Sequence, residues 1–303
     1  MDVHGKGVLL LALINKFVSR AKDYLQGNHF EVGIDLQGAA IVNEIIDGHF
    51  RKEVMGLNAF DILSETDIYV AVKNSNGFRP SLFVSQNAFE TLCRHLISKL
   101  KPVSLDCAES VAAELNKLFH KVDMEELESF STLKVRILEI IDRLILSRLT
   151  PTKVFISEFF EIEAGFINTK HPDFINSATD SIVNSTRKDE KKPNGSVISD
   201  STSAPIKNIP KRERNEIDLI KQMIFNYFEV VKKNICDYIP KIVLTLLVKQ
   251  TIDLCEREIV GVLYKPENID NLLKENPDTV ERHRLLIDEI EAIKGALKML
   301  NTI

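Results

Sequence analysis

The chain has 303 residues, of which 44% are hydrophobic and 27% are charged, so it can bury a substantial core. Its formal net charge of -5 argues against nucleic-acid binding, because neutralising phosphates requires a clustered excess of Lys and Arg. Tryptophan is absent, and glycine and proline number only 12 and 10, which predicts an all-α protein rather than a turn-rich β fold.

The first predicted helix presents Leu10, Leu13 and Phe17 on one face. Its apolar stretch, Val8–Ile14, is far shorter than the roughly 20 residues that cross a bilayer as a helix. The stretch is also similar to a signal-peptide core. Because Lys16 follows so closely, a buried helix is the better interpretation.

A second helical region is expected over Gly38–Val72, and the segment Asn74–Pro80 predicts a turn. A long helix should then start after Ser85, which can cap it, and continue through a kink at Pro102. Its apolar positions recur at spacings of three and four: Phe89, Leu92, Leu96 and Leu100. Another long helix is expected after Asp123, with the stripe Phe130, Leu133, Ile137, Ile141 and Leu144.

Residues 183–214 differ in composition from the rest of the chain. They contain few large apolar residues and many Ser, Lys, Pro and Asn, so we expect a disordered linker. The linker separates an N-terminal part, 1–182, from a C-terminal part, 215–303.

The C-terminal part begins with a further predicted helix that Pro240 should interrupt. Its apolar positions are Ile217, Ile220, Ile224, Phe228, Val231 and Ile235. The last helix, expected over about Asp278–Asn301, has spacings of four and three. They place five side chains on one face: Leu286, Ile290, Ile293, Leu297 and Leu300. Leaving all five in water would forgo on the order of 10 kcal/mol, which predicts a partner for this face.

No catalytic or metal-binding pattern is evident. The four cysteines, Cys93, Cys107, Cys236 and Cys255, form no CxxC pair, and they are interpreted as buried thiols in a reducing cytosol. The seven histidines form neither a ligand pair nor a triad with a nucleophile. We therefore expect no catalytic residue, no metal and no cofactor in this chain.

Five collinear blocks resemble the dynamin family. They are Asn76–Leu92 (NGFRPSLFVSQNAFETL), Leu100–Leu115 (LKPVSLDCAESVAAEL), Phe166–Ile175 (FINTKHPDFI) and two blocks within Lys233–Glu275. The last block is similar to the GTPase effector domain of that family, whose Gly-x-Leu-Tyr-Lys pattern and paired leucines correspond here to Gly261, Leu263, Tyr264, Lys265, Leu272, Leu273 and Glu275. The vacuolar-sorting and organelle-fission types are nearer than the endocytic ones, because nothing in the linker resembles a pleckstrin-homology domain.

The resemblance implies an elongated antiparallel four-helix stalk bundle, with a C-terminal helix of the bundle-signalling type that couples to a dynamin-type GTPase domain. It implies self-assembly through the stalk, and it assigns Gly77, Arg79 and Pro80 to an assembly contact at a turn. Ala40 departs from the family, which commonly has an arginine there. One assembly contact is therefore expected to differ.

The family hydrolyses GTP with Mg²⁺ through a P-loop of the form GxxxxGK followed by Ser or Thr, and this sequence contains none. The segment DLQG, Asp35–Gly38, matches a four-letter switch pattern too short to be specific, inside a stalk-like block. The chain is therefore expected to be a truncated product, one half of a split gene or part of a longer protein.

The linker contributes eight basic residues against four acidic ones. A solvated spacer is one interpretation; the other, which the resemblance favours, is a contact with anionic membrane lipids. The residues assigned to that contact are Lys188, Lys191, Lys192, Lys207, Lys211, Arg212 and Arg214. A cytoplasmic protein that is peripheral on membranes is expected.

Three functions remain open at this point. The chain is a self-assembling stalk and effector module for GTP-driven membrane fission or remodelling, a fragment of a complete dynamin-like GTPase, or a regulatory subunit that co-assembles with one.

Overall fold

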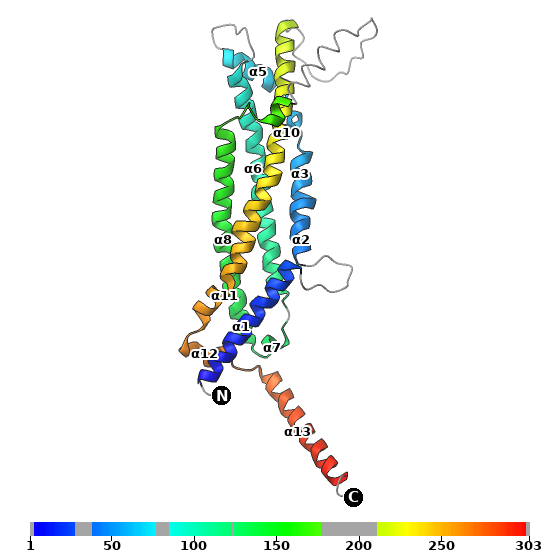
Figure 1. The fold of residues 1–303 in the computed structure, drawn as a ribbon, viewed down its shortest axis with the longest axis vertical. Helices are drawn as coiled ribbons and strands as arrows, with labels where there is room; N and C mark the ends of the chain where they lie inside the picture. The colour runs from blue at the N-terminus through cyan, green and yellow to red at the C-terminus, as the bar shows by residue number, and fades with distance from the viewer. Residues whose placement is uncertain (1–2, 28–37, 77–84, 123, 177–210, 301–303) are drawn as a thin grey trace. The chain divides into compact units, whose positions relative to one another are not determined.

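The computed structural model describes residues 3–27, 38–76, 85–122, 124–176 and 211–300 (Figure 1). These residues form helices, and no strand occurs among them, so the all-α prediction is confirmed. The elements are α1 (Val3–Gln26), α2 (Ala39–Asn43), the π-helical η1 (Glu44–Phe50), α3 (Arg51–Gly56), α4 (Ala59–Ile62), α5 (Glu65–Asn76), α6 (Gln86–His120), α7 (Glu125–Glu128), α8 (Ser131–Gly165), α10 (Lys211–Ile242), the π-helical η2 (Val243–Lys249), α11 (Gln250–Leu263), α12 (Pro266–Leu272) and α13 (Pro277–Leu300).

The chain divides into two compact units, each assembled from separated segments. The first unit comprises residues 1–43, 110–151 and 244–303. The second comprises residues 44–109 and 152–243. Each unit therefore draws on both the N-terminal and the C-terminal part of the sequence.

In the first unit, α1 packs along α11 and α12. The predicted face of α1 is buried, since Leu10 and Phe17 are almost fully enclosed, and Ile259 of α11 is equally buried. A close approach fixes this packing, because a Cβ atom at Gly7 would lie 3.2 Å from the Tyr264 hydroxyl. The tyrosine of the effector pattern thus packs against α1, while 45% of its surface stays exposed.

A second close approach lies where α2 begins. Gly38 has φ +54°, and a Cβ atom there would lie 2.2 Å from the Tyr24 carbonyl oxygen. Only glycine fits this position without a shift of the backbone. The glycine of the DLQG segment therefore has a structural role.

In the second unit, α10 packs against α3, α4 and α5. The predicted apolar stripe of α10 is buried along its whole length: Ile217, Ile220, Ile224, Phe228, Val231 and Ile235. Aromatic rings add to this core, with Phe89 of α6 lying 5.9 Å from Tyr227 and 6.0 Å from Phe174 between ring centroids. Such contacts favour one arrangement of the rings.

The region predicted as one helical stretch over Gly38–Val72 is broken into five elements. Asn58 caps α4 through its side chain, which accepts a hydrogen bond from the Phe60 amide at 3.2 Å. At the start of α5, Asp67 accepts from the Ser64 amide at 2.9 Å, and Ser64 Oγ accepts from the Asp67 amide at 3.1 Å. This reciprocal arrangement is a capping box, and it holds the pKa of Asp67 below its usual value.

Lys232 of α10 contacts the backbone where α3 ends and α4 has not yet begun. Its ammonium group donates to the carbonyl oxygens of Met55 (3.2 Å) and Leu57 (3.0 Å) and pairs with Glu229 at 2.6 Å. Only 3% of its side chain is exposed. The buried charge is thus compensated by an ion pair and two carbonyl dipoles.

The predictions for the long helices mostly hold. Ser85 caps α6 through a 3.4 Å contact with the Ala88 amide, and α6 continues through Pro102. The expected interruption at Pro240 was wrong in its position, because α10 continues through the proline to Ile242, where η2 follows. The stripe of α8 is buried at Leu133, Ile137, Ile141 and Leu144, whereas Phe130 precedes the helix and is only half-buried.

The turn prediction is wrong for residues 74–76, since α5 extends to Asn76. The linker prediction also needs adjustment, because α10 begins at Lys211, so that residues 211–214 are helical. The remainder of both segments lies outside the described residues.

Candidate functional site

The face of α13 that the sequence singled out is exposed. Leu286, Ile290, Ile293 and Leu297 retain 48%, 50%, 55% and 53% of their accessible surface. We call these four residues the α13 seam. Leu300 ends the helix, and its side chain lies outside the description. The described part of the chain therefore does not supply the partner that the sequence predicts for this face.

The sequence missed a second exposed apolar surface. It consists of Phe155, the half-buried Phe159 and Ile162 near the end of α8, Phe166 directly after that helix, and Tyr238 of α10. We call it the α8–α10 patch. Ile162 and Phe166 are 71% and 74% exposed, and the Phe159 ring lies 5.5 Å from that of Tyr238. Large apolar side chains gathered in this way mark interaction surfaces.

A signal for the patch was present in the sequence. Its α8 members recur at spacings of four and three, which places them on one helical face, and Phe166 follows Ile162 by four residues. That face differs from the one through Ile156 and Phe160, which is buried in the same half of α8. A helix with two apolar faces has more apolar surface than one core contact requires.

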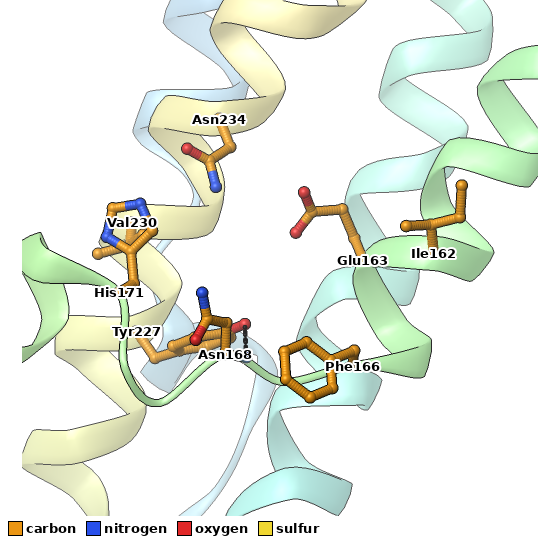
Figure 2. Close-up of a pocket in the computed structure, with 8 residues that line it drawn as sticks. All are labelled: Ile162, Glu163, Phe166, Asn168, His171, Tyr227, Val230 and Asn234. Carbon is orange, nitrogen blue, oxygen red and sulfur yellow. Dashed lines mark hydrogen bonds between the residues drawn. The ribbon is translucent and has the colours of Figure 1, made fainter.

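A pocket opens beside the patch (Figure 2). It is lined by Ile162, Glu163, Phe166, Asn168, His171, Tyr227, Val230 and Asn234. Its volume is about 210 Å³. In the close-up, Glu163 of α8 and Asn234 of α10 lie on opposite sides of the pocket, with Asn168 and His171 contributed by the segment after α8. The pocket therefore combines an apolar rim with a small set of polar groups.

Two groups in the pocket titrate abnormally. Burial raises the pKa of Glu163, with a smaller opposing effect from His171. Burial also raises the pKa of Tyr227 to about 12, and its hydroxyl accepts a hydrogen bond from the Asn168 amide at 3.1 Å. The His171 ring accepts from the Asp173 amide through Nδ1 at 3.2 Å, so a neutral imidazole carries its proton on Nε2.

The predicted assembly residues Gly77, Arg79 and Pro80 lie outside the described residues. So do Lys188, Lys191, Lys192 and Lys207 of the predicted membrane contact. Lys211 and Arg212 are the first two residues of α10, and their side chains lie outside the description. Arg214 is exposed in the first turn of α10. The neighbouring Glu213 pairs with Lys73 of α5 at 2.8 Å, and this partner raises the pKa of Lys73.

Ala40, which replaces the arginine of the family pattern, is exposed on α2. An arginine at this position would therefore have been accessible to a neighbouring molecule.

The cysteines are all buried and free. Burial raises the pKa of each thiol, to about 12 for Cys107 and Cys255. Cys93 and Cys236 shift in the same direction for the same reason. Because the thiolate is the reactive and metal-binding form, these residues are poor nucleophiles at neutral pH.

Across the described ranges, no group of three or more His, Cys, Asp or Glu residues could hold a metal ion. Among those same residues, no helix has both the length and the apolarity that crossing a membrane requires.

Comparison with known proteins assigns most of the chain. The family described as "Dynamin central region" matches residues 1–182, and the family described as "Dynamin GTPase effector domain" matches residues 212–303. The chain is 24% identical to the "Dynamin-1-like protein drp-1" of Caenorhabditis elegans over 379 aligned residues, which cover 99% of this chain and 53% of the relative. It is 26% identical to the "Dynamin-1-like protein" of Danio rerio over 359 residues, covering 98% and 52%.

A plant relative gives a shorter and stronger match. The "Dynamin-related protein 3A" of Arabidopsis thaliana is 34% identical over 172 residues, which cover 56% of this chain and 21% of the relative. Overall, the chain spans about half the length of the first two relatives.

Proposed function

The chain belongs to the dynamin family, and we propose that it is a stalk and effector module that self-assembles on membranes and couples this assembly to a GTPase domain. The observation that carries the proposal is the exposed α13 seam. GTP and Mg²⁺ would be bound by the GTPase domain and not by this chain, whose sequence lacks a P-loop.

The α13 seam suits a helical partner. Its residues recur at spacings of four, three and four, the a/d pattern that packs against other helices. Each retains about half of its surface, so burying the remainder of all four would contribute about 3–6 kcal/mol. The proposed partner is the pair of helices that flank a dynamin-type GTPase domain.

The test is to mix the chain with a purified dynamin-type GTPase domain that carries its flanking helices. We expect binding by calorimetry and a changed rate of GTP hydrolysis. Ile290→Asp should weaken binding at least tenfold, because it places a charge in the buried face. Leu285→Asp is the matched control, since Leu285 is exposed on the same helix but about 100° away from the seam. Equal losses in both variants would refute the role of the seam.

The α8–α10 patch is the proposed surface for self-association through the stalk. A second copy of the chain is the proposed occupant, because self-assembly is the behaviour that the family resemblance implies for the stalk. The exposed Phe and Ile side chains of the α8–α10 patch provide the kind of apolar anchor on which interfaces depend. The turn residues Gly77, Arg79 and Pro80 would form a separate contact for higher-order assembly. Arg79→Glu should leave the fold intact and reduce higher-order assembly in sedimentation; unchanged assembly would remove it from the interface.

The linker is the proposed contact with anionic lipids. At roughly 1 kcal/mol per net basic charge, a single copy would bind with only about millimolar affinity, so the contact depends on many copies arranged together. Flotation with liposomes should therefore depend on anionic lipid and fall with salt. Flotation that ignores both would exclude an electrostatic contact.

The fragment and regulatory-subunit alternatives predict different results. An in-frame P-loop in the native transcript would make this chain part of a complete GTPase. A regulatory subunit would alter the GTPase rate of a full-length relative when it is added in trans.

A further inference from the structure

The pocket in the second unit contains a carboxylate without a partner among the described residues. Glu163 is partly buried, and no hydrogen bond or ion pair within the described ranges reaches its side chain. Figure 2 shows its carboxylate directed across the pocket toward α10. Burying this charge is costly, and the electrostatic effect of His171 opposes that cost only in part, so the position is favourable for a cation.

Apart from His171, two basic side chains of the same unit, Lys233 and Arg94, are engaged elsewhere. Lys233, next to the pocket residue Asn234, pairs with Asp173 at 3.8 Å. Arg94 of α6 pairs with Glu90 at 2.7 Å and donates to the Ala164 carbonyl oxygen at 3.0 Å. Both cations therefore have other partners, and the pocket remains open to an external one.

The remaining lining groups define the chemistry of the occupant. The side chains of Asn168 and Asn234 offer amide oxygens, which accept hydrogen bonds as the carboxylate does. The Phe166 and Tyr227 rings form part of the wall, and aromatic faces attract planar cations. At about 210 Å³ the pocket is smaller than those that enclose drug-sized ligands.

We propose that this pocket binds a guanidinium group carried on a short alkyl chain, with Glu163 as the anionic partner and Asn168 and Asn234 as further acceptors. The group comes either from an arginine side chain of a second copy or from a free organic cation. Binding stabilises the ionised carboxylate, so it lowers the pKa of Glu163 toward the ordinary range.

N-Ethylguanidinium is the probe, and N-ethylurea is its uncharged counterpart of nearly the same shape. The chain has five tyrosines, so labelling with 3-fluorotyrosine gives a simple ¹⁹F spectrum in which Tyr227→Phe identifies the pocket signal. At constant ionic strength, N-ethylguanidinium should shift the Tyr227 signal saturably, and N-ethylurea should not.

Glu163→Gln should weaken this response at least tenfold, whereas Glu161→Gln, an exposed carboxylate on the same helix, should leave it unchanged. Equal responses to the two probes, or an unchanged response in Glu163→Gln, would overturn the proposal. Sedimentation with saturating probe distinguishes the sources. A lower average mass identifies the side chain of a second copy, and an unchanged mass identifies a free cation. Ile162 and Phe166 belong to both the pocket and the α8–α10 patch, so the probe is titrated at a concentration at which the chain is monomeric, where its binding does not depend on whether the patch mediates assembly.

Discussion

Replacing Lys232 by Met tests how the break between α3 and α4 is held on α10. The substitution keeps the apolar length of the side chain and removes its charge and its donors. Met55 and Leu57 then lose the donor to their carbonyl oxygens, and Glu229 loses its ion-pair partner.

The expected cost follows from the burial of these groups. Removing one partner of a fully buried pair costs about 3–5 kcal/mol, and each unsatisfied buried acceptor costs about 1–3 kcal/mol. Glu229 is one-third exposed and Met55 is 40% exposed, so water can replace part of what is lost. We therefore expect Lys232→Met to lower the free energy of unfolding by about 2–4 kcal/mol.

Urea denaturation followed by circular dichroism measures this loss, and hydrogen exchange locates it. Amides near Leu57 should exchange faster in the variant if Lys232 holds this segment. The matched control is Lys233→Met, because the neighbouring Lys233 is 62% exposed and its pair with Asp173 is long. That control should change stability by no more than about 0.5 kcal/mol. A Lys232→Met variant as stable as this control would refute the reasoning.

Three further predictions concern a turn, a buried charge and a surface. Gly38→Ala should lower the melting temperature by several degrees, because it combines a positive φ with a backbone clash at Tyr24; a melt that matches wild type would contradict this. Glu163→Gln should raise the melting temperature at pH 7, since a raised carboxyl pKa means that stability falls as pH rises through the folded-state value; melts at pH 5 and pH 7 should therefore differ less in the variant. Ile162→Asp should lower the average mass in sedimentation, because it places a charge in the α8–α10 patch. Val262→Asp, on the exposed face of α11, is the control and should lower it less.

Helical periodicity predicted the fold class and the buried faces well. The stripes through Leu96 in α6, Ile137 in α8 and Ile224 in α10 all lie in the core. These helices are long, so their apolar spacing repeats often enough to be unambiguous. The short elements before α5 were not separated, because their ends depend on single capping side chains such as Asn58 and not on a repeated pattern.

The candidate sites were predicted less completely, for a physical reason. An apolar spacing shows that a face must be covered, but it does not show whether the cover comes from the same chain. Phe159 and Ile162 follow the same periodic rule as Ile137, yet Ile162 is exposed and Ile137 is buried. The polar pocket around Glu163 had no sequence signal, since its lining comes from α8, α10 and the segment between them.

Within the effector-domain match, residues 212–303, the burial of side chains changes near Asn276. Before it, Leu263 and Leu272 of the effector pattern are buried in the first unit, and Lys6 of α1 holds Asp270 at 2.7 Å. The Asn276 amide donates to the Ser129 carbonyl oxygen at 2.9 Å, and the side chains described beyond it in α13 are exposed. Substitutions before this point should therefore act through stability. Those in the α13 seam should act through partner binding alone, because burying Ile290 or Ile293 is left to another molecule. A seam variant that unfolds the first unit would contradict this division.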